Sequence, residues 1–207
     1  SETAWLKERG CVLILLWQKG KPKERIIIGI LGVTHGTGAT HLGIALANYC
    51  RSRHHAKTAY LEVNDSHELC GLWDTESQSR FSIYGVDYFS DVALTELSHF
   101  YTLDYQYLIL DFGVPDTAHY QDFLRCDRKL VLGSLSPWKK NCFEEFFKVY
   151  QPAQQPKENL VYLALFGNRA DLFDFSCSHH LPIRAVPFIA NPFQLETNLF
   201  SFLENLI

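Results

Sequence analysis

A run of aliphatic residues that leads into a glycine-rich segment constrains this chain more than any other feature. Residues 26–31 are almost entirely apolar, which is typical of a short strand buried on both faces of a parallel sheet. The segment 32–40 is rich in glycine, and the residues after it predict a helix with an apolar face made by Leu42, Ile44, Ala45, Leu46 and Tyr49. Strand, glycine loop and helix in this order predict a phosphate cradle, because backbone N–H groups and the positive end of the helix dipole converge on one anion.

The end of the loop departs from the usual phosphate-binding pattern at one position. Gly38, Ala39 and Thr40 match the end of the P-loop template G-x-x-x-x-G-K-[ST], except that alanine stands where the template has lysine. Two interpretations therefore stay open. Either the backbone still holds a phosphate without the lysine, or the loop is a glycine turn before a core helix and binds no ligand.

Composition describes an ordinary folded protein and excludes some functions. Hydrophobic residues make up 47% and charged residues 20% of the 207 residues, with a formal net charge of −4. This balance gives no strong signal for nucleic-acid binding through bulk positive charge. The cysteines are scattered without a C-x-x-C pair or metal-ligand spacing, and no signal peptide is apparent, so we expect reduced thiols and a cytoplasmic location.

The first residues predict an extension before the main domain. We expect an N-terminal extension and linker over residues 1–24 and one P-loop NTPase-like domain over residues 25–207. The apolar run 11–17 is too short to span a bilayer. It is interpreted either as an extra element packed on the domain or as a docking element for a partner or a membrane surface, so any membrane contact would be peripheral.

Further strands and helices follow in alternation. Buried strands are predicted over residues 58–63, 105–111, 129–133, 160–166 and 184–189, a short alternating strand over 81–88, and helices over 91–103, 137–150 and 193–206. This order predicts an α/β three-layer sandwich, a mostly parallel sheet with helices on both faces. Its ligand crevice would lie at the carboxyl ends of the strands.

Four landmarks in this order resemble the ParA/MinD family of P-loop ATPases, which carry the loop K-G-G-x-G-K-[ST]. Aligned by its glycines, the chain places His35 and Ala39 at the two family lysines and Thr40 at the magnesium-binding hydroxyl. Glu62 falls on the first aspartate of the family's D-x-D strand end and Asn64 on the second. Asp111 ends an apolar strand as a Walker B carboxylate does.

The fourth landmark follows a later strand and completes the expected site. Asn168 and Arg169 match the family's asparagine that reads adenine and the basic residue after it. The resemblance implies ATP or ADP with Mg²⁺, with Thr40 and Asp111 as metal-binding residues and Glu62 and Asp111 as catalytic residues. The residues that it implies for nucleotide binding are His35, Gly36, Thr37, Gly38, Ala39, Thr40, His41, Asn168 and Arg169.

Within that family, the lysine-poor loop looks closest to the TadZ/CpaE branch, which localises pilus and secretion machinery. The resemblance implies a homodimer and a protein partner from a pilus, secretion or cell-division machinery. Without the two lysines we expect slow or lost ATP hydrolysis, a pseudo-ATPase with a regulatory or localisation role.

Two other functions are kept as alternatives. One is an active ATPase or ligase whose charge has been relocated, with Arg53, Lys57 and Arg169 as candidate cations. The other is an interaction module that keeps the architecture and binds no ligand.

Overall fold

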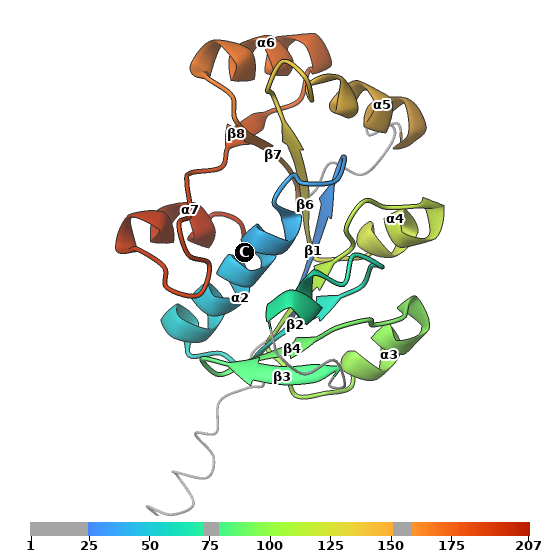
Figure 1. Cartoon of the computed structure of the whole chain (residues 1–207), viewed down its shortest axis with the longest axis vertical. Helices are drawn as coiled ribbons and strands as arrows, with labels where there is room; N and C mark the ends of the chain where they lie inside the picture. The colour runs from blue at the N-terminus through green and yellow to red at the C-terminus, as the bar shows by residue number, and fades with distance from the viewer. Residues whose placement is uncertain (1–24, 73–78, 151–158) are drawn as a thin grey trace, which may run out of the picture.

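The computed structural model describes residues 25–72, 79–150 and 159–207, and it shows one eight-stranded sheet between two layers of helices (Figure 1). The expected N-terminal extension lies outside the described residues, so the division into residues 1–24 and 25–207 stays a prediction. In chain order the elements are β1 (Ile26–Gly32), α2 (Ala39–His54), β2 (Thr58–Glu62), η1 (Glu68–Leu72), β3 (Arg80–Ile83), β4 (Val86–Phe89), η2 (Leu94–Glu96), α3 (Leu97–Phe100), β5 (Tyr107–Asp111), α4 (Thr117–Phe123), β6 (Arg128–Ser134), α5 (Asn141–Tyr150), β7 (Leu160–Leu165), α6 (Arg169–His179), β8 (Ile183–Ala185), η4 (Thr197–Leu199) and α7 (Phe200–Glu204).

The sheet confirms the predicted fold class. Its strand order is β3-β4-β2-β5-β1-β6-β7-β8, with β1 between β5 and β6. All of the described strand pairs are parallel except β3 with β4. Strand β1 is therefore central, and the loops that follow β2, β5, β1 and β6 leave the sheet at one common edge.

Two hydrophobic cores cover the two faces of this sheet. Alternate residues of β1 divide between them: Ile28 and Ile30 pack under α2 and α7, and Leu31 packs on the opposite face. That opposite core contains aromatic side chains from α3, α4, α5 and α6, namely Phe100, Tyr120, Phe123, Phe143, Phe146 and Phe175. Figure 1 shows α2 and α7 on one side of the sheet and α3 and α4 on the other.

Helix α2 is buried over an unusually long stretch. Every residue from Leu42 to Cys50 is buried, and α7 contacts α2 and contributes Leu203 to the same core. Among them, the polar Asn48 donates to the carbonyl of Ile44 at 2.9 Å and to the hydroxyl of Tyr88 at 2.8 Å. The predicted apolar face is thus confirmed, and the helix is apolar beyond it.

Several predicted elements differ from the structure. The single strand expected over residues 81–88 is wrong: Tyr84 and Gly85 adopt φ angles of 49° and 80° and turn the chain into the hairpin β3–β4. Two central residues with positive φ are the mark of a tight hairpin turn. The helix expected from residue 137 begins at Asn141, and the one expected over 91–103 is reduced to η2 and the short α3. Helices α4 and α6 were not predicted.

No helix within the described ranges has both the length and the apolar character that a membrane crossing requires.

Gly133 in β6 allows α5 to lie close to the sheet, and this contact can be tested. A Cβ at Gly133 would lie less than 3.0 Å from three ring atoms of the fully buried Phe143. We expect Gly133→Ala to lower the free energy of unfolding by about 1–3 kcal/mol, since an added core methyl forces its neighbours to shift. Urea denaturation measures the change.

Gly71→Ala is the matched control, because nothing lies within 4 Å of a Cβ at Gly71. Its stability should stay near that of the original chain. If both variants unfold at the same urea concentration, close packing of α5 does not explain why glycine occupies position 133.

Candidate functional site

The loop between β1 and α2 turns through two glycines and ends at the start of a helix. Gly36 and Gly38 have φ angles of 69° and 73°, in the left-handed region that glycine adopts without strain. Helix α2 begins at Ala39, and Gly38 caps it without a side-chain hydrogen bond. The first N–H groups of a helix have no partner within the helix, and no acidic residue occupies this first turn. An anion therefore finds backbone donors at this point.

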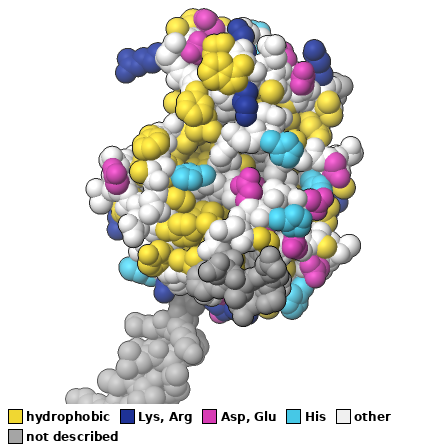
Figure 2. Space-filling view, viewed as in Figure 1, with side chains coloured by type: hydrophobic (Ala, Val, Ile, Leu, Met, Phe, Trp, Pro, Cys, Tyr) yellow, Lys and Arg dark blue, Asp and Glu magenta, His cyan; other side chains and the backbone are white. Residues whose placement is uncertain are grey.

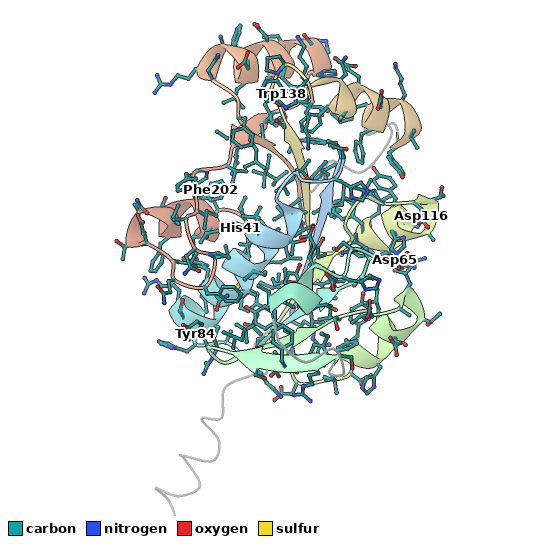
Figure 3. The ribbon with its side chains drawn as sticks, in the orientation of Figure 1. His41, Asp65, Tyr84, Asp116, Trp138 and Phe202 are labelled. Carbon is teal, nitrogen blue, oxygen red and sulfur yellow. The ribbon has the colours of Figure 1, made fainter. Side chains whose placement is uncertain are left out.

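A cavity of about 310 Å³ opens beside this loop. Its walls come from the β1–α2 loop, the loop after β2 and the loop after β5. The lining residues are Gly32, Thr34, His35, Gly36, Thr37, Gly38, Ala39, Thr40, Asn64, Asp65, Ser66, Glu68, Phe112, Gly113, Val114, Asp116 and His119. Figure 3 shows Asp65 and Asp116 on the side of the molecule that carries these loops. Every expected residue from His35 to Thr40 therefore lines one space.

Asp111 joins the three elements below this cavity. One of its oxygens accepts hydrogen bonds from the hydroxyls of Thr40 and Tyr60, each at 2.6 Å, and the other accepts from the N–H of Gly113 at 2.9 Å. The carboxyl group is fully buried, and burial raises its pKa against the lowering effect of these hydrogen bonds. Asp111 thus ties α2, β2 and the loop after β5 together.

Tyr60 reaches Asp111 because the helix above it leaves room. Gly43 lies over the Tyr60 ring, and a Cβ at Gly43 would come within 2.7 Å of it. A tyrosine two residues before the end of β2 carries no sequence signal of function, so its role was not predicted. Its hydroxyl occupies an acceptor position of Asp111.

The donor set at the loop fits a magnesium ion in chemistry. Thr40 lines the cavity and gives its proton to Asp111, so its oxygen lone pairs are available to a hard cation. Asp111 itself does not line the cavity and would act on metal-bound water at most. The structure therefore brings the two expected metal-binding residues together, and of the two only the half-buried Thr40 lines the cavity.

Glu62 lies next to Asp111 in the sheet but is turned into the protein. The two residues are paired across β2 and β5, and the Glu62 side chain is fully buried. One carboxyl oxygen accepts from Ser66 Oγ and from the N–H of Leu69, each at 3.2 Å. The other oxygen is buried and has no hydrogen-bond partner among the described residues. Burial raises the pKa of this carboxyl group.

Glu62 therefore holds the loop after β2 and does not line the cavity. Asn64, the second residue of the expected pair, does line it. Its amide donates to the carbonyl of Asp111 at 2.9 Å, and its oxygen accepts from the N–H of Ser66. The catalytic role expected for Glu62 stays a prediction.

The remaining expected residues lie away from the cavity. Asn168 is the N-cap of α6, where its side-chain oxygen accepts from the N–H groups of Ala170 and Asp171. Arg169 is exposed on the first turn of that helix. His41 contacts the carbonyl of Ile189 at 2.8 Å and so links α2 to the segment after β8 (Figure 3). The adenine-binding role of Asn168 stays a prediction.

The charge around the cavity is not what a triphosphate site usually offers. Among the described lining residues there is no lysine or arginine, but there are three carboxylates, Asp65, Glu68 and Asp116. The N–H and ring nitrogen of His119 bind Asp116 at 2.9 and 2.8 Å and lower the pKa of its carboxyl group. On the face shown in Figure 2, acidic and histidine side chains gather on the side of α4.

Two of the cations that we expected to replace the charge of the missing P-loop lysine, Arg53 and Lys57, do not lie near the glycine loop. Arg53 lies at the end of α2, a helix of 16 residues and hence about 24 Å long, beside Tyr49 and Glu204. Lys57, just after it, lies over the ring of Tyr105 at 5.0 Å. Both are at the far end of α2 from the glycine loop. The structure instead brings Lys139 to the loop, where its ammonium group donates to the carbonyl of His35 at 2.7 Å.

The structure also brings together one group of possible metal ligands that the sequence did not predict. Ligand atoms of His67, Cys70 and Asp91 lie within 4.8 Å of one another, and all three residues are exposed. His67 and Asp91 already form a pair at 2.6 Å. This pair satisfies both groups without an ion.

Comparison with known proteins gives matches in structure alone. No protein-family model matches this chain, and no curated protein sequence matches it. A ParA family ATPase from Chlorobium tepidum is similar over 81% of this chain and 85% of its own, with 13% identity and a TM-score of 0.61. A putative plasmid partition protein from Borrelia burgdorferi, bound to AMPPNP, is similar over 89% and 97%, with 15% identity and a TM-score of 0.57.

The MinD cell division protein of Aquifex aeolicus is similar over 87% of this chain and 86% of its own, with 10% identity and a TM-score of 0.58. At these identities the likeness establishes the fold. The chain has the ParA/MinD-like P-loop NTPase fold.

The buried Glu62 generates a prediction on pH. Its pKa is higher in the folded protein than its ordinary value of 4.5, so the folded protein binds the extra proton more tightly than the unfolded chain. The stability that this proton contributes is complete below pH 4.5 and is lost as the pH rises through the raised pKa. We expect Glu62→Gln to lack this part of the pH dependence.

Urea unfolding of both proteins between pH 4 and pH 8 measures the difference. The stability of the original chain minus that of Glu62→Gln should fall as the pH rises. Parallel curves for the original chain and Glu62→Gln would mean that Glu62 titrates normally in the folded protein.

Proposed function

We propose that this chain is a nucleotide-binding regulatory or localisation protein, with ATP or ADP as ligand and slow or lost hydrolysis. One observation carries the proposal. The loop of residues 36–40 keeps the backbone shape of a phosphate cradle at the start of a buried helix, while Ala39 replaces the lysine that would reach the β- and γ-phosphates. Without this lysine, backbone N–H groups can still bind a phosphate, whereas catalysis loses a positive charge that stabilises the transition state.

Weak hydrolysis follows from the charges that catalysis needs. A hydrolase must stabilise the charge that develops in the transition state, and removing one such donor typically costs about 2.7–4 kcal/mol of barrier. Here the lining offers acidic groups, Glu62 is buried and does not line the cavity, and Asp111 is already bonded to Tyr60. These three features support a binding protein over a fast enzyme.

A divalent cation is part of the proposal. Mg²⁺ would neutralise charge between the phosphates and the carboxylates of Asp65, Glu68 and Asp116, and Thr40 is the residue that would hold it. We therefore propose that the chain binds nucleotide more tightly with Mg²⁺ than without it.

Exposed aromatic side chains support a protein partner. Trp138, Phe166 and Phe188 are 81%, 78% and 89% exposed, and they follow the carboxyl ends of the neighbouring strands β6, β7 and β8. Figure 3 shows Trp138 between α5 and α6, and Figure 2 shows further hydrophobic side chains over β8 and α7. Large exposed apolar groups of this kind mark interaction surfaces. We propose a homodimer or a localisation partner of the TadZ/CpaE kind at this surface.

A ligand-free interaction module is the second candidate. The acidic lining and the saturated Asp111 favour it, because both oppose a bound triphosphate. Calorimetric titration with ATP, with Mg²⁺ and with EDTA, separates the two candidates. Heat of binding at or below millimolar ATP supports the nucleotide-binding proposal, and its absence supports the module.

Restoring the lysine tests the site itself. We expect Ala39→Lys to raise ATP affinity about tenfold or more, since a hydrogen bond to a charged group contributes roughly 1.5–3 kcal/mol. Ala39→Gln, which adds length without charge, should gain much less. Hydrolysis should stay slow in both variants, because the Glu62 side chain stays buried and does not line the cavity.

Calorimetry and a phosphate-release assay check this prediction. A gain in both affinity and turnover would favour an enzyme with a relocated charge. No gain in a folded Ala39→Lys would contradict the phosphate cradle.

A further inference from the structure

The turn after β6 lies beside the glycine loop. Strands β1 and β6 are paired in parallel up to Gly32 and Leu132, and the N–H of Val33 donates to the carbonyl of Leu132 at 2.8 Å. The chain leaves both strands at the same edge of the sheet. Residues just beyond the end of β6 are therefore held beside the loop, although about a hundred positions separate the two in sequence.

Buried hydroxyl groups fix the course of this turn. Ser134 and Ser136 are buried, and their hydroxyls are hydrogen-bonded at 2.9 Å. The carbonyl of Ser136 accepts from the N–H groups of Lys139 and Lys140, each at 2.9 Å. These hydrogen bonds fix the backbone of Lys139 and Lys140, whereas their side chains can adopt different conformations.

The two lysines take different directions. The ammonium group of Lys139 donates to the carbonyl of His35 at 2.7 Å and lies 3.3 Å from where a Cβ on Gly36 would be. Lys140 is exposed and lines a different hollow, with Glu144 and Asp171. Only the first of them touches the phosphate loop.

We propose that Lys139 is a phosphate-binding residue that supplies, from the turn after β6, the positive charge that Ala39 does not. This inference rests on the proposed function and assigns a residue to it. An ammonium group has three donors, and His35 takes one of them, so two are available to a phosphate oxygen. His35 and Gly36, which Lys139 contacts, both line the cavity.

The electrostatic situation favours such a role. The described lining of the cavity carries three carboxylates and no lysine or arginine, and Lys139 brings a positive charge to its edge. The flexible four-carbon stem of lysine lets its charge move toward a ligand while the turn stays fixed. Arg169, the remaining cation of the original expectation, is exposed at the start of α6 and does not line the cavity.

A purely structural role for Lys139 makes a different prediction. If the ammonium group only holds the His35 carbonyl, its loss would disturb the loop and weaken every ligand alike, whatever its charge. If it binds phosphate, the loss of affinity grows with the number of phosphates. Comparison of ATP with AMP therefore separates the two roles.

The test is a titration of the full chain with MgATP and with AMP. Lys139→Gln should lower the affinity for MgATP about tenfold or more, as expected for the loss of a charge-assisted hydrogen bond, and should change the affinity for AMP much less. Lys140→Gln, the matched control, should stay within twofold for both ligands. Lys139→Arg, which keeps the charge, should retain most of the MgATP affinity.

A double variant completes the test. Ala39→Lys combined with Lys139→Gln should recover MgATP affinity, because the charge returns at the position of the template. If Lys139→Gln binds MgATP as the original chain does, or loses MgATP and AMP equally, the inference is wrong and the proposed function stands. If the original chain binds no MgATP at millimolar concentration, both fail. Melting temperatures of the variants show that each is folded.

Discussion

The buried carboxyl group of Asp111 is the interaction on which the site depends. It accepts hydrogen bonds from Thr40 at the start of α2, from Tyr60 in β2 and from the backbone of Gly113. A buried carboxylate is stable only when its oxygens are satisfied, so these contacts hold the glycine loop, the β2 end and the loop after β5 in one arrangement. The cavity is the space that this arrangement leaves open.

The same contacts support the proposal that the chain binds nucleotide and hydrolyses it slowly or not at all. In an ATPase the strand-end carboxylate acts on the metal shell, whereas here Tyr60 takes one of its acceptor positions. Glu62 keeps its carboxyl group inside the protein, where it holds Ser66 and Leu69. Both carboxylates that the resemblance assigns to catalysis therefore support the frame of the site. The backbone donors of the loop stay open to an anion.

The sequence predicted the parts of this structure that have strong local signals. The aliphatic run of β1, the glycines of the loop and the aspartate at the end of β5 placed the cavity correctly, since the carboxyl ends of parallel strands meet at one edge. The hairpin β3–β4 was missed because Tyr84 breaks an otherwise alternating pattern through its backbone conformation, and residue type alone does not show this.

The finer chemistry of the site depends on contacts between distant parts of the chain. Nothing near Tyr60 in sequence indicates that its hydroxyl reaches Asp111, because that contact needs the space left by Gly43. Lys139 is 104 positions from His35, and only the pairing of β1 with β6 brings them together. Asn168 has the residue type of a base-reading side chain, yet its oxygen caps α6. The resemblance in fold therefore predicts where a residue lies, but the role of its side chain depends on the hydrogen bonds that it makes.

The most direct test of the account is to follow the backbone amides of Gly36, Thr37 and Gly38 by nuclear magnetic resonance during addition of MgATP. If the loop binds phosphate through its N–H groups, we expect large, saturable shifts of these amide signals with ATP and with inorganic pyrophosphate, and much smaller ones with adenosine. Amide signals that stay in place at millimolar MgATP, in a folded protein, would contradict it.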